Sequence, residues 1–296
     1  MSTNDTPLVS ILLPVYNAGA YLHDVMESIL AQTFPNFEVV VVDDGSTDDS
    51  NEIVETYAEK DERIRLIRNC HDFIESLNLG LAECRGKYVA RMDADDKMNP
   101  NRLAMQVEVM ESNSDIAFCS SYMQRMGAED IYNSGISGKV ENLAETLLLG
   151  NFISHPTVML RQEFLHLHQL QYRKCYDYAE DYKLWTEIAE VGGSLYIIPK
   201  PLIAYRISEE QVSRVHHEEQ YESALRIKNE LIEWLLNQEE VRCYKEFSEF
   251  YRLLSNLNEK CLLAPEEIFE LFYRVLMRYH SANHVCLQSD KVRQTK

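Results

Sequence analysis

The chain has 296 residues, of which 45% are hydrophobic, and a formal net charge of −19 at pH 7. This length predicts about two domains of roughly 150 residues, each large enough to bury a hydrophobic core. The negative charge argues against nucleic acid as a partner, because that binding depends on Lys and Arg side chains that neutralise phosphates, but it allows a nucleotide bound through a metal ion.

Composition also predicts where the protein works. Its seven scattered cysteines include no C-x-x-C pair, a pattern typical of reduced thiols in the cytoplasm. The first ten residues have neither the cationic start nor the long apolar region of a signal peptide, and no run approaches the about 18 apolar residues of a membrane span. We therefore expect a cytoplasmic protein, with peripheral attachment to a membrane left open.

The first part of the chain alternates between buried strands and amphipathic helices. VSILLPVY (9–16) is a near-continuous apolar run, typical of a strand that is buried on both faces. The segments 37–43, 63–68 and 87–92 predict three more strands, and the residues between successive strands repeat apolar side chains at helical spacing. This order predicts an α/β fold with a doubly wound, mainly parallel sheet and flanking helices.

Further elements follow, in an order that is less regular. We expect a helix from Pro100 to about Ser112, a strand at 116–121, a mobile loop at 127–139, a strand at 155–161, a helix at 179–190 and a strand or strand pair at 194–206. From about residue 217 the pattern is helical and carries no chemical motif. We therefore divide the chain into a first domain, 1–215, and a C-terminal helical extension, 216–296, that packs or forms a homo-oligomer.

Polar clusters stand at the ends of three predicted strands: PVYN (14–17), DDGS (43–46) and DADD (93–96). In a doubly wound sheet the carboxyl ends of the strands meet at one edge, where ligands bind. We therefore expect these clusters to form one site, although they are far apart in the sequence.

The DADD cluster places Asp93, Asp95 and Asp96 directly after a buried strand. Carboxylate oxygens are the ligands that Mg²⁺ and Mn²⁺ prefer, whereas a solvated acidic turn is the simpler alternative. A calcium loop is excluded, because the fifth, sixth and twelfth positions of the EF-hand pattern do not match. Since Mg²⁺ is usually held by one or two carboxylates together with substrate phosphates, the cluster favours a diphosphate ligand.

Asp43 and Asp44 follow four consecutive valines. A helix cap explains residues 46–49 but not these two carboxylates, which can accept hydrogen bonds from a base N–H or from ribose hydroxyls. Tyr16 fits either a base-stacking role or packing on the sheet. A Rossmann site and a P-loop are both excluded, because Gly19 is the single glycine of the first turn and no G-K-[ST] occurs.

Glu180 and Asp181 form an acidic pair at the start of the helix predicted at 179–190. Acidic residues favour the first turn of a helix, but a carboxylate that faces a sugar hydroxyl can also act as a general base. Trp185 lies on an aromatic face that fits either a core or a sugar platform. His155 either reaches the site or is a hydrogen-bonded residue of a strand.

Together these segments resemble a known family. VSILLPVYNAGAYLHDVMESILAQTFPNFEVVVVDDGSTDDS (9–50), then RMDADD (91–96) and ED (180–181), resemble the family 2 glycosyltransferases of the GT-A fold over about residues 9–213. The resemblance implies transfer of a sugar from a nucleotide-diphosphate sugar, commonly a UDP-sugar, to an acceptor hydroxyl with inversion, with Mn²⁺ or Mg²⁺ as cofactor. It also implies a glycan or glycolipid acceptor and a role in the biosynthesis of surface polysaccharide.

The same resemblance implies roles for individual residues. The nucleotide-binding candidates are Pro14, Tyr16, Asn17, Asp43, Asp44, Arg68, Asp93 and Ala94. Asp95 matches the metal ligand, and Asp181 matches the catalytic base, with Glu180 beside it. We add His155 and Trp185 as candidate contacts of the acceptor or donor.

Processive synthases of this family have a Q-x-x-R-W motif and membrane helices. Here Gln211 and Arg214 are present, but Val215 replaces the Trp, which favours a non-processive transferase. One alternative is a catalytically inactive homologue that binds a nucleotide or a partner. A second alternative, a nucleotidyltransferase, requires a basic phosphate loop after the first strand, and YNAGAY contains no Lys or Arg.

Overall fold

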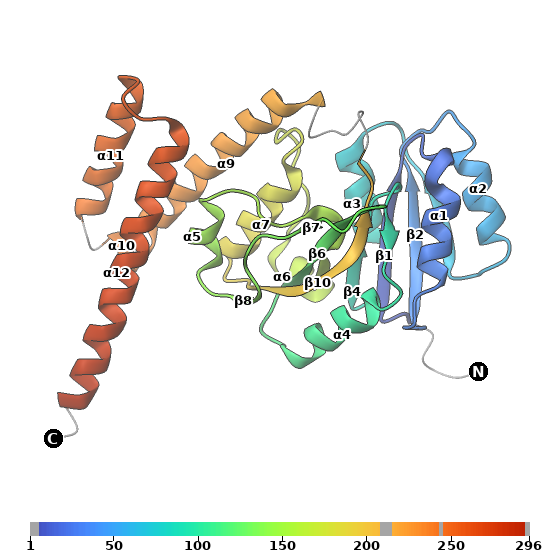
Figure 1. Cartoon of the computed structure of the whole chain (residues 1–296), viewed down its shortest axis with the longest axis horizontal. Helices are drawn as coiled ribbons and strands as arrows, with labels where there is room; N and C mark the ends of the chain where they lie inside the picture. The colour runs from blue at the N-terminus through green and yellow to red at the C-terminus, as the bar shows by residue number, and fades with distance from the viewer. Residues whose placement is uncertain (1–5, 208–214, 243–244, 294–296) are drawn as a thin grey trace. The chain divides into compact units, whose positions relative to one another are not determined.

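The computed structural model describes residues 6–207, 215–242 and 245–293 (Figure 1). The chain divides into two compact units, residues 1–141 with 152–220 and residues 142–151 with 221–296. All candidate site residues belong to the first unit. The functional boundary at residue 215 stays a prediction, and Gln211 and Arg214 lie outside the described residues.

The first unit is built on one mixed sheet. Its strands are β1 Val9–Val15, β2 Phe37–Asp43, β3 Ile64–Arg68, β4 Tyr88–Arg91, β5 Lys97–Met98, β6 Phe118–Arg125, β7 Ile131–Tyr132, β8 Gly138–Val140, β9 Met159–Arg161 and β10 Leu195–Tyr205. They lie in the order β3-β2-β1-β4-β9-β6-β10-β5, with β7 paired to β6 and β8 to β10. Figure 1 shows β2, β1 and β4 side by side. Strands β1 to β4 pair in parallel, and β9 is antiparallel to both neighbours. The predicted α/β fold with a mainly parallel sheet is confirmed.

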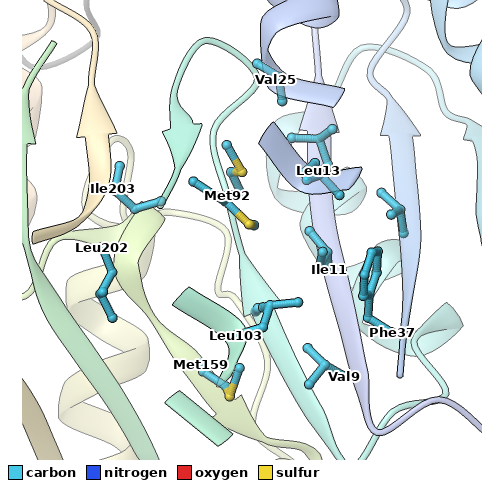
Figure 2. Close-up of a cluster of buried hydrophobic side chains, with 14 of the residues drawn as sticks. Val9, Ile11, Leu13, Val25, Phe37, Met92, Leu103, Met159, Leu202 and Ile203 are labelled. Carbon is cyan, nitrogen blue, oxygen red and sulfur yellow. The ribbon is translucent and has the colours of Figure 1, made fainter. Parts of the chain in front are cut away.

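Helices cover both faces of this sheet. The first unit contains α1 Gly19–Leu30, α2 Ser50–Ala58, α3 Phe73–Glu83, α4 Arg102–Ser112, η1 His155–Thr157, α6 Gln162–His168 and α7 Glu180–Glu190. On one face, Ile11 and Leu13 of β1 belong to the same buried cluster as Val25 of α1 and Leu103 of α4 (Figure 2). Helix α3 packs on β1 and β2 from the other face, as right-handed crossovers require.

Gly80 lets α3 approach the sheet closely. A Cβ atom at this position would lie 2.1 Å from Cδ1 of Leu12 and 3.0 Å from Cγ2 of Val42. Leu12 alternates with Ile11 and Leu13, so its side chain points to the opposite face of β1. The two faces of the first strand are therefore both buried, as its continuous apolar sequence predicts.

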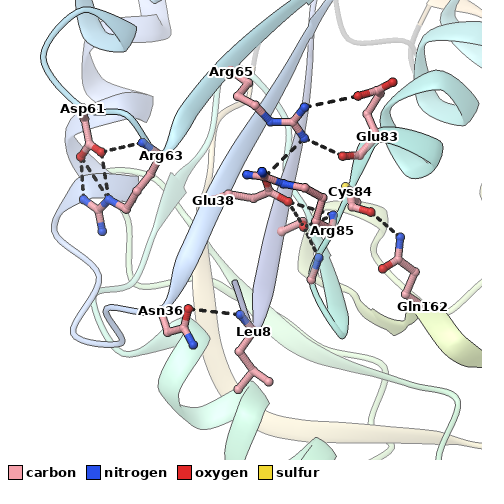
Figure 3. Close-up of polar contacts among 12 residues, drawn as sticks. Leu8, Asn36, Glu38, Asp61, Arg63, Arg65, Glu83, Cys84, Arg85 and Gln162 are labelled. Atoms are coloured by element: carbon pink, nitrogen blue, oxygen red, sulfur yellow. Dashed lines mark hydrogen bonds and ion pairs between the residues drawn. The ribbon is translucent and has the colours of Figure 1, made fainter. Parts of the chain in front are cut away.

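At the amino ends of the strands, polar groups are paired with one another (Figure 3). Glu38 of β2 is 2% exposed and accepts hydrogen bonds from Ser10 and from Nε and Nη2 of Arg85, and it lies 3.3 Å from Nη2 of Arg65. Burial opposes ionisation of Glu38, but these hydrogen bonds hold its pKa below the usual range. Both oxygens of the buried Glu38 carboxylate are therefore paired, which stabilises this edge of the sheet.

Several local predictions were wrong. The segment 127–139, predicted as a mobile loop, contains β7 and the start of β8. Strands of two or three residues are too short to show an alternating pattern, which also explains why β5 was missed. The predicted strand at 155–161 begins with the 3-10 turn of His155–Thr157, where Pro156 cannot donate to a ladder, and becomes β9 only at Met159.

The second unit is helical, as predicted for the C-terminal extension. It comprises α5 Leu143–Leu147, most of α9 His217–Asn237, α10 Glu239–Arg242, α11 Lys245–Glu259 and α12 Pro265–Arg293. Phe247 of α11 packs edge-on against Phe272 of α12, with ring centroids 6.3 Å apart. Among the described residues, no helix combines the length and the apolar character that crossing a membrane requires.

Candidate active site

The sheet order brings the three polar clusters to one edge. Strands β2, β1 and β4 are adjacent and parallel, so the residues that follow their carboxyl ends are neighbours in space. Tyr16 follows β1, Asp44 follows β2 and Asp93 follows β4 by two residues. The common edge that the sequence predicts is therefore present.

Tyr16 lies at the surface of this edge and stacks on a residue that the sequence argument missed. Its side chain is 48% exposed, and its ring lies against that of His71, with centroids 4.2 Å apart and an interplanar angle of 25°. Nδ1 of His71 is 3.1 Å from Oδ2 of Asp44. Pro14, two residues before Tyr16, is buried within β1. Nothing in the local sequence marks His71, which lies far along the chain from both of its partners.

The carboxylate of Asp44 is 2% exposed and holds the start of α3. Its Oδ1 accepts hydrogen bonds from the backbone N–H of Asp72, at 2.8 Å, and from the hydroxyl of Ser76, at 2.7 Å. Asp43 accepts from the backbone N–H of Ser46 and from Nδ2 of Asn51, at 3.0 Å. Both carboxylates therefore order the turns around the edge, and Oδ2 of Asp44 is bonded to His71 alone among the described residues.

Asn17 and Arg68 are placed at the rim of this region. Asn17 has a φ of 47° and accepts a hydrogen bond from the backbone N–H of Thr47 at 2.8 Å, so it joins the loops after β1 and β2. Arg68 is exposed and forms an ion pair with Glu55 of α2. In the ladder of β2 and β3, Arg68 lies opposite Asp43.

The carboxylates of Asp93, Asp95 and Asp96 form a compact acidic triad, with one oxygen of each lying within 4.8 Å of the others. Ala94 between them is half-buried. Burial, reinforced by the charge of Asp93, raises the pKa of Asp95 to about 6 and also raises that of Asp96. Oδ1 of Asp96 accepts from the backbone N–H of Arg206, whereas its buried Oδ2 has no hydrogen-bond partner within the described part of the chain.

Among the residues that the structure describes, three arginines surround this triad, and none of them was predicted from the sequence. Arg91 is 3% exposed, and its Nη1 lies 2.5 Å from Oδ1 of Asp93. Arg102 is fully buried and donates to the backbone carbonyl of Arg91 at 2.7 Å. Arg206, directly after β10, donates through Nε to the carbonyl of Asp95 at 2.9 Å. An arginine inside the apolar run of β4 was the one available signal, because such a charge needs a partner.

The acidic pair at the start of α7 lies within electrostatic reach of the triad. Glu180 is 8% exposed, and burial, together with the charge of Asp181, raises its pKa. The charge of Asp93 adds to this increase and that of Arg91 opposes it. Asp181 is half-buried. The structure thus brings the two acidic motifs into one region, with Arg91 as a shared counter-charge.

The loop before α7 has a strained backbone. Tyr178 has a φ of 60°, a region that non-glycine residues rarely adopt. Its ring stacks on His216 with centroids 4.0 Å apart, and its carbonyl accepts from Nε2 of Gln220 at 2.8 Å. Strain of this kind is stored where the surrounding contacts hold the chain, often beside functional groups.

Trp185 and His155 are packed inside the first unit, which corrects the prediction that they contact a sugar directly. Trp185 is 0% exposed and stacks on Phe118 of β6, with centroids 4.9 Å apart. His155 is buried against Trp185 and lies 2.8 Å from the hydroxyl of Tyr172 through Nε2. Burial, with the charge of Arg91, lowers the pKa of His155, so it stays neutral. Trp185 thus anchors α7 to the core, and both side chains offer little surface to a ligand.

The triad fits a hard divalent cation. Its donors are all carboxylate oxygens, which suit Mg²⁺ and Mn²⁺. Burial, and next the charge of Asp93, raises the pKa of Asp95, and Oδ2 of Asp96 is buried without a hydrogen-bond partner among the described residues. A bound cation would stabilise the charged form of these buried carboxylates and give Oδ2 of Asp96 a partner.

Relatives of the chain are glycosyltransferases. An uncharacterized glycosyltransferase of Haemophilus influenzae is 37% identical over 243 residues, covering 78% of this chain and 75% of the relative. One of Rickettsia bellii is 36% identical over 209 residues, and the chain spans 29% of its length. TuaG of Bacillus subtilis, assigned to teichuronic acid biosynthesis, is 30% identical over 214 residues, covering 71% of this chain and 83% of the relative.

Solved structures share the fold. TarS of S. aureus, in complex with UDP-GlcNAc, has a TM-score of 0.65 at 22% identity, covering 84% of this chain and 71% of the TarS chain. The mannosyltransferase PcManGT of Pyrobaculum calidifontis, with GDP-Man and Mn²⁺, has a TM-score of 0.56 at 17% identity, covering 92% of this chain and 85% of its own. The sequence model of glycosyl transferase family 2 matches residues 10–167. With this match and the Haemophilus relative, the chain belongs to glycosyl transferase family 2.

Proposed function

We propose that the chain transfers a sugar from a UDP-sugar to a hydroxyl of a glycan or glycolipid acceptor, with inversion and with a divalent metal. The observation that carries this proposal is the acidic triad of Asp93, Asp95 and Asp96 beside the pair of Glu180 and Asp181. A cation site for a diphosphate and a half-buried carboxylate for an acceptor hydroxyl are the two parts that such a transfer needs.

The ligands of proteins that resemble this chain support the choice of donor and metal. TarS has been solved with UDP-GlcNAc and PcManGT with GDP-Man and Mn²⁺. The assignment of TuaG to teichuronic acid biosynthesis supports a polysaccharide or related glycan as product. We extend the nucleotide-sugar donor, the metal and the glycan product to this chain, as a non-processive transferase. It would work at the cytoplasmic side, in peripheral contact with a membrane where the acceptor is a lipid.

In this mechanism Tyr16 and Asp44 hold the base, and Asp93 lies near the ribose. A metal ion at Asp95, with the neighbouring carboxylates, would neutralise the diphosphate as it leaves. Asp181 accepts the proton of the acceptor hydroxyl while that oxygen attacks the anomeric carbon opposite the diphosphate. The new glycosidic bond forms as the bond to UDP breaks, which inverts the configuration.

Calorimetric titration with UDP, with and without Mn²⁺, tests the proposal. We expect the wild-type protein to bind UDP only with the metal, and Asp95→Ala to weaken this binding at least about tenfold. Asp130→Ala, at an exposed carboxylate on the loop after β6, is the matched control and should bind as the wild type does. If UDP binds without the metal and binds equally well to Asp95→Ala, the triad is a solvated acidic turn and not a metal site.

Product analysis separates the remaining candidates. A transferase releases free UDP, a nucleotidyltransferase releases pyrophosphate, and an inactive homologue releases neither. The absence of turnover with any nucleotide sugar, in a protein that binds UDP, would favour the inactive homologue.

A further inference from the structure

His71 already makes the two contacts that the proposed function assigns to a nucleobase. Its planar ring stacks on Tyr16 at a centroid distance of 4.2 Å, and its Nδ1 lies 3.1 Å from Oδ2 of Asp44. A base held by these residues would likewise stack on Tyr16 and donate an N–H to Asp44. The imidazole therefore occupies the position of the base.

The hydrogen bond identifies which ring nitrogen carries the proton. Nδ1 is 3.1 Å from both the backbone carbonyl oxygen and Oδ2 of Asp44, and both are acceptors. Nδ1 must therefore be the donor, because two acceptors beside an unprotonated nitrogen would repel it. The contact is the same in kind as one from the N3–H of uracil.

The ring can leave this position without a change in the backbone. The side chain of His71 is 63% exposed, so rotation about its χ1 bond carries the ring into solvent. The backbone itself is held close to Gly45, where a Cβ atom would lie 3.3 Å from the nitrogen of His71, and by the neighbouring hydrogen bond from Asp72 to Asp44. Movement is thus confined to the side chain.

We propose that His71 is a placeholder for the nucleobase: its ring fills the base position in the free protein and must rotate out before a nucleotide binds. The inference rests on the proposed function, since it takes Tyr16 and Asp44 as the base-binding residues. Rotation frees Oδ2 of Asp44 and one face of Tyr16 together. Only the rotated form binds, so the apparent affinity is the intrinsic affinity multiplied by the fraction of molecules in that form. A small rotated fraction therefore means weak apparent binding.

Titration of His71 variants with UDP and Mn²⁺ tests this placeholder. His71→Ala removes the competing ring, and we expect it to bind UDP about tenfold more tightly than the wild type. His71→Phe keeps a stacking ring without the N–H donor, so its affinity should fall between the two. His166→Ala, at an exposed histidine of α6, is the control and should match the wild type. Thermal melting establishes that each variant is folded.

Inorganic pyrophosphate with Mn²⁺ is the ligand control, because it has no base. We expect its affinity to be equal in all four proteins, and a parallel gain for pyrophosphate and UDP in His71→Ala would overturn the placeholder. Unchanged or weaker binding of UDP by His71→Ala would also overturn it, and weaker binding would make His71 a contact of the base. A wild-type protein that binds no nucleotide would instead overturn the proposed function itself.

Discussion

Glu180 and Asp181 are adjacent in the sequence but have different environments, which suits them to different tasks. Glu180 is buried, whereas Asp181 is half-buried and can face an acceptor. A general base has to reach the proton that it removes, so exposure favours Asp181 for this role. The sequence supplies the pair, and the helix geometry of α7 distinguishes its members.

Asp181→Asn tests the catalytic role. An amide cannot accept the acceptor proton, so we expect kcat to fall at least about 100-fold, with UDP affinity unchanged. Asp177→Asn, at an exposed carboxylate of the preceding loop, is the control and should keep the wild-type rate. Turnover close to the wild-type rate in Asp181→Asn would remove this residue from the role of base.

Glu180→Gln tests the raised pKa of Glu180. The folded protein retains a proton on Glu180 that the unfolded chain releases, so the free energy of unfolding falls as the pH rises above the ordinary carboxyl value of about 4.3. The neutral amide avoids this cost. We expect Glu180→Gln to increase the free energy of unfolding by about 1–3 kcal/mol at about pH 8, and to change it little at about pH 4.

Denaturant unfolding at the two pH values measures this effect. Glu163→Gln, at an exposed position of α6, serves as control and should show no difference between them. Equal stability of Glu180→Gln and the wild type at the higher pH would contradict a raised pKa.

At the scale of elements, α7 is anchored by its buried aromatic face. Trp185 packs between Phe118 of β6 and His155 of the 3-10 turn, and this packing fixes the helix whose first turn carries Asp181. Periodicity places Trp185 on an aromatic face but cannot distinguish a core from an exposed platform. The distinction comes from β6 and η1, which lie elsewhere in the sequence.

Two substitutions of Trp185 test this packing role. Trp185→Ala leaves a cavity and should lower the free energy of unfolding by about 3–5 kcal/mol. Trp185→Phe retains a ring against Phe118, so we expect a smaller loss of stability and an unchanged KM for the acceptor. Unfolding curves and acceptor kinetics measure the two effects. A large increase of the acceptor KM in a stable Trp185→Phe protein would instead support a direct contact between Trp185 and the sugar.

At the scale of the whole molecule, the negative charge predicts that a diphosphate binds only together with a metal ion. The chain carries a net charge of −19, and three of its carboxylates crowd at the site. With EDTA present we expect the affinity for UDP to fall at least about tenfold, while that for uridine, which has no phosphate, changes less than about twofold. Competition titrations measure both, and equal losses for the two ligands would place the metal elsewhere.

The sequence by itself determined the sheet from β1 to β4, the helices between these strands and the positions of the acidic motifs at the strand ends. These features follow from local patterns, because continuous apolar runs and helical spacing are properties of neighbouring residues. The family resemblance also rests on such local motifs, which is why it was available before the structure.

Only the tertiary structure decided which side chains meet. His71 reaches Tyr16 and Asp44, and Arg206 reaches Asp95, across long stretches of sequence that carry no sign of these contacts. The burial of Trp185 likewise depends on a distant strand. The physical reason is that sheet order and loop packing bring remote residues together, and neither is encoded in the spacing of any single segment.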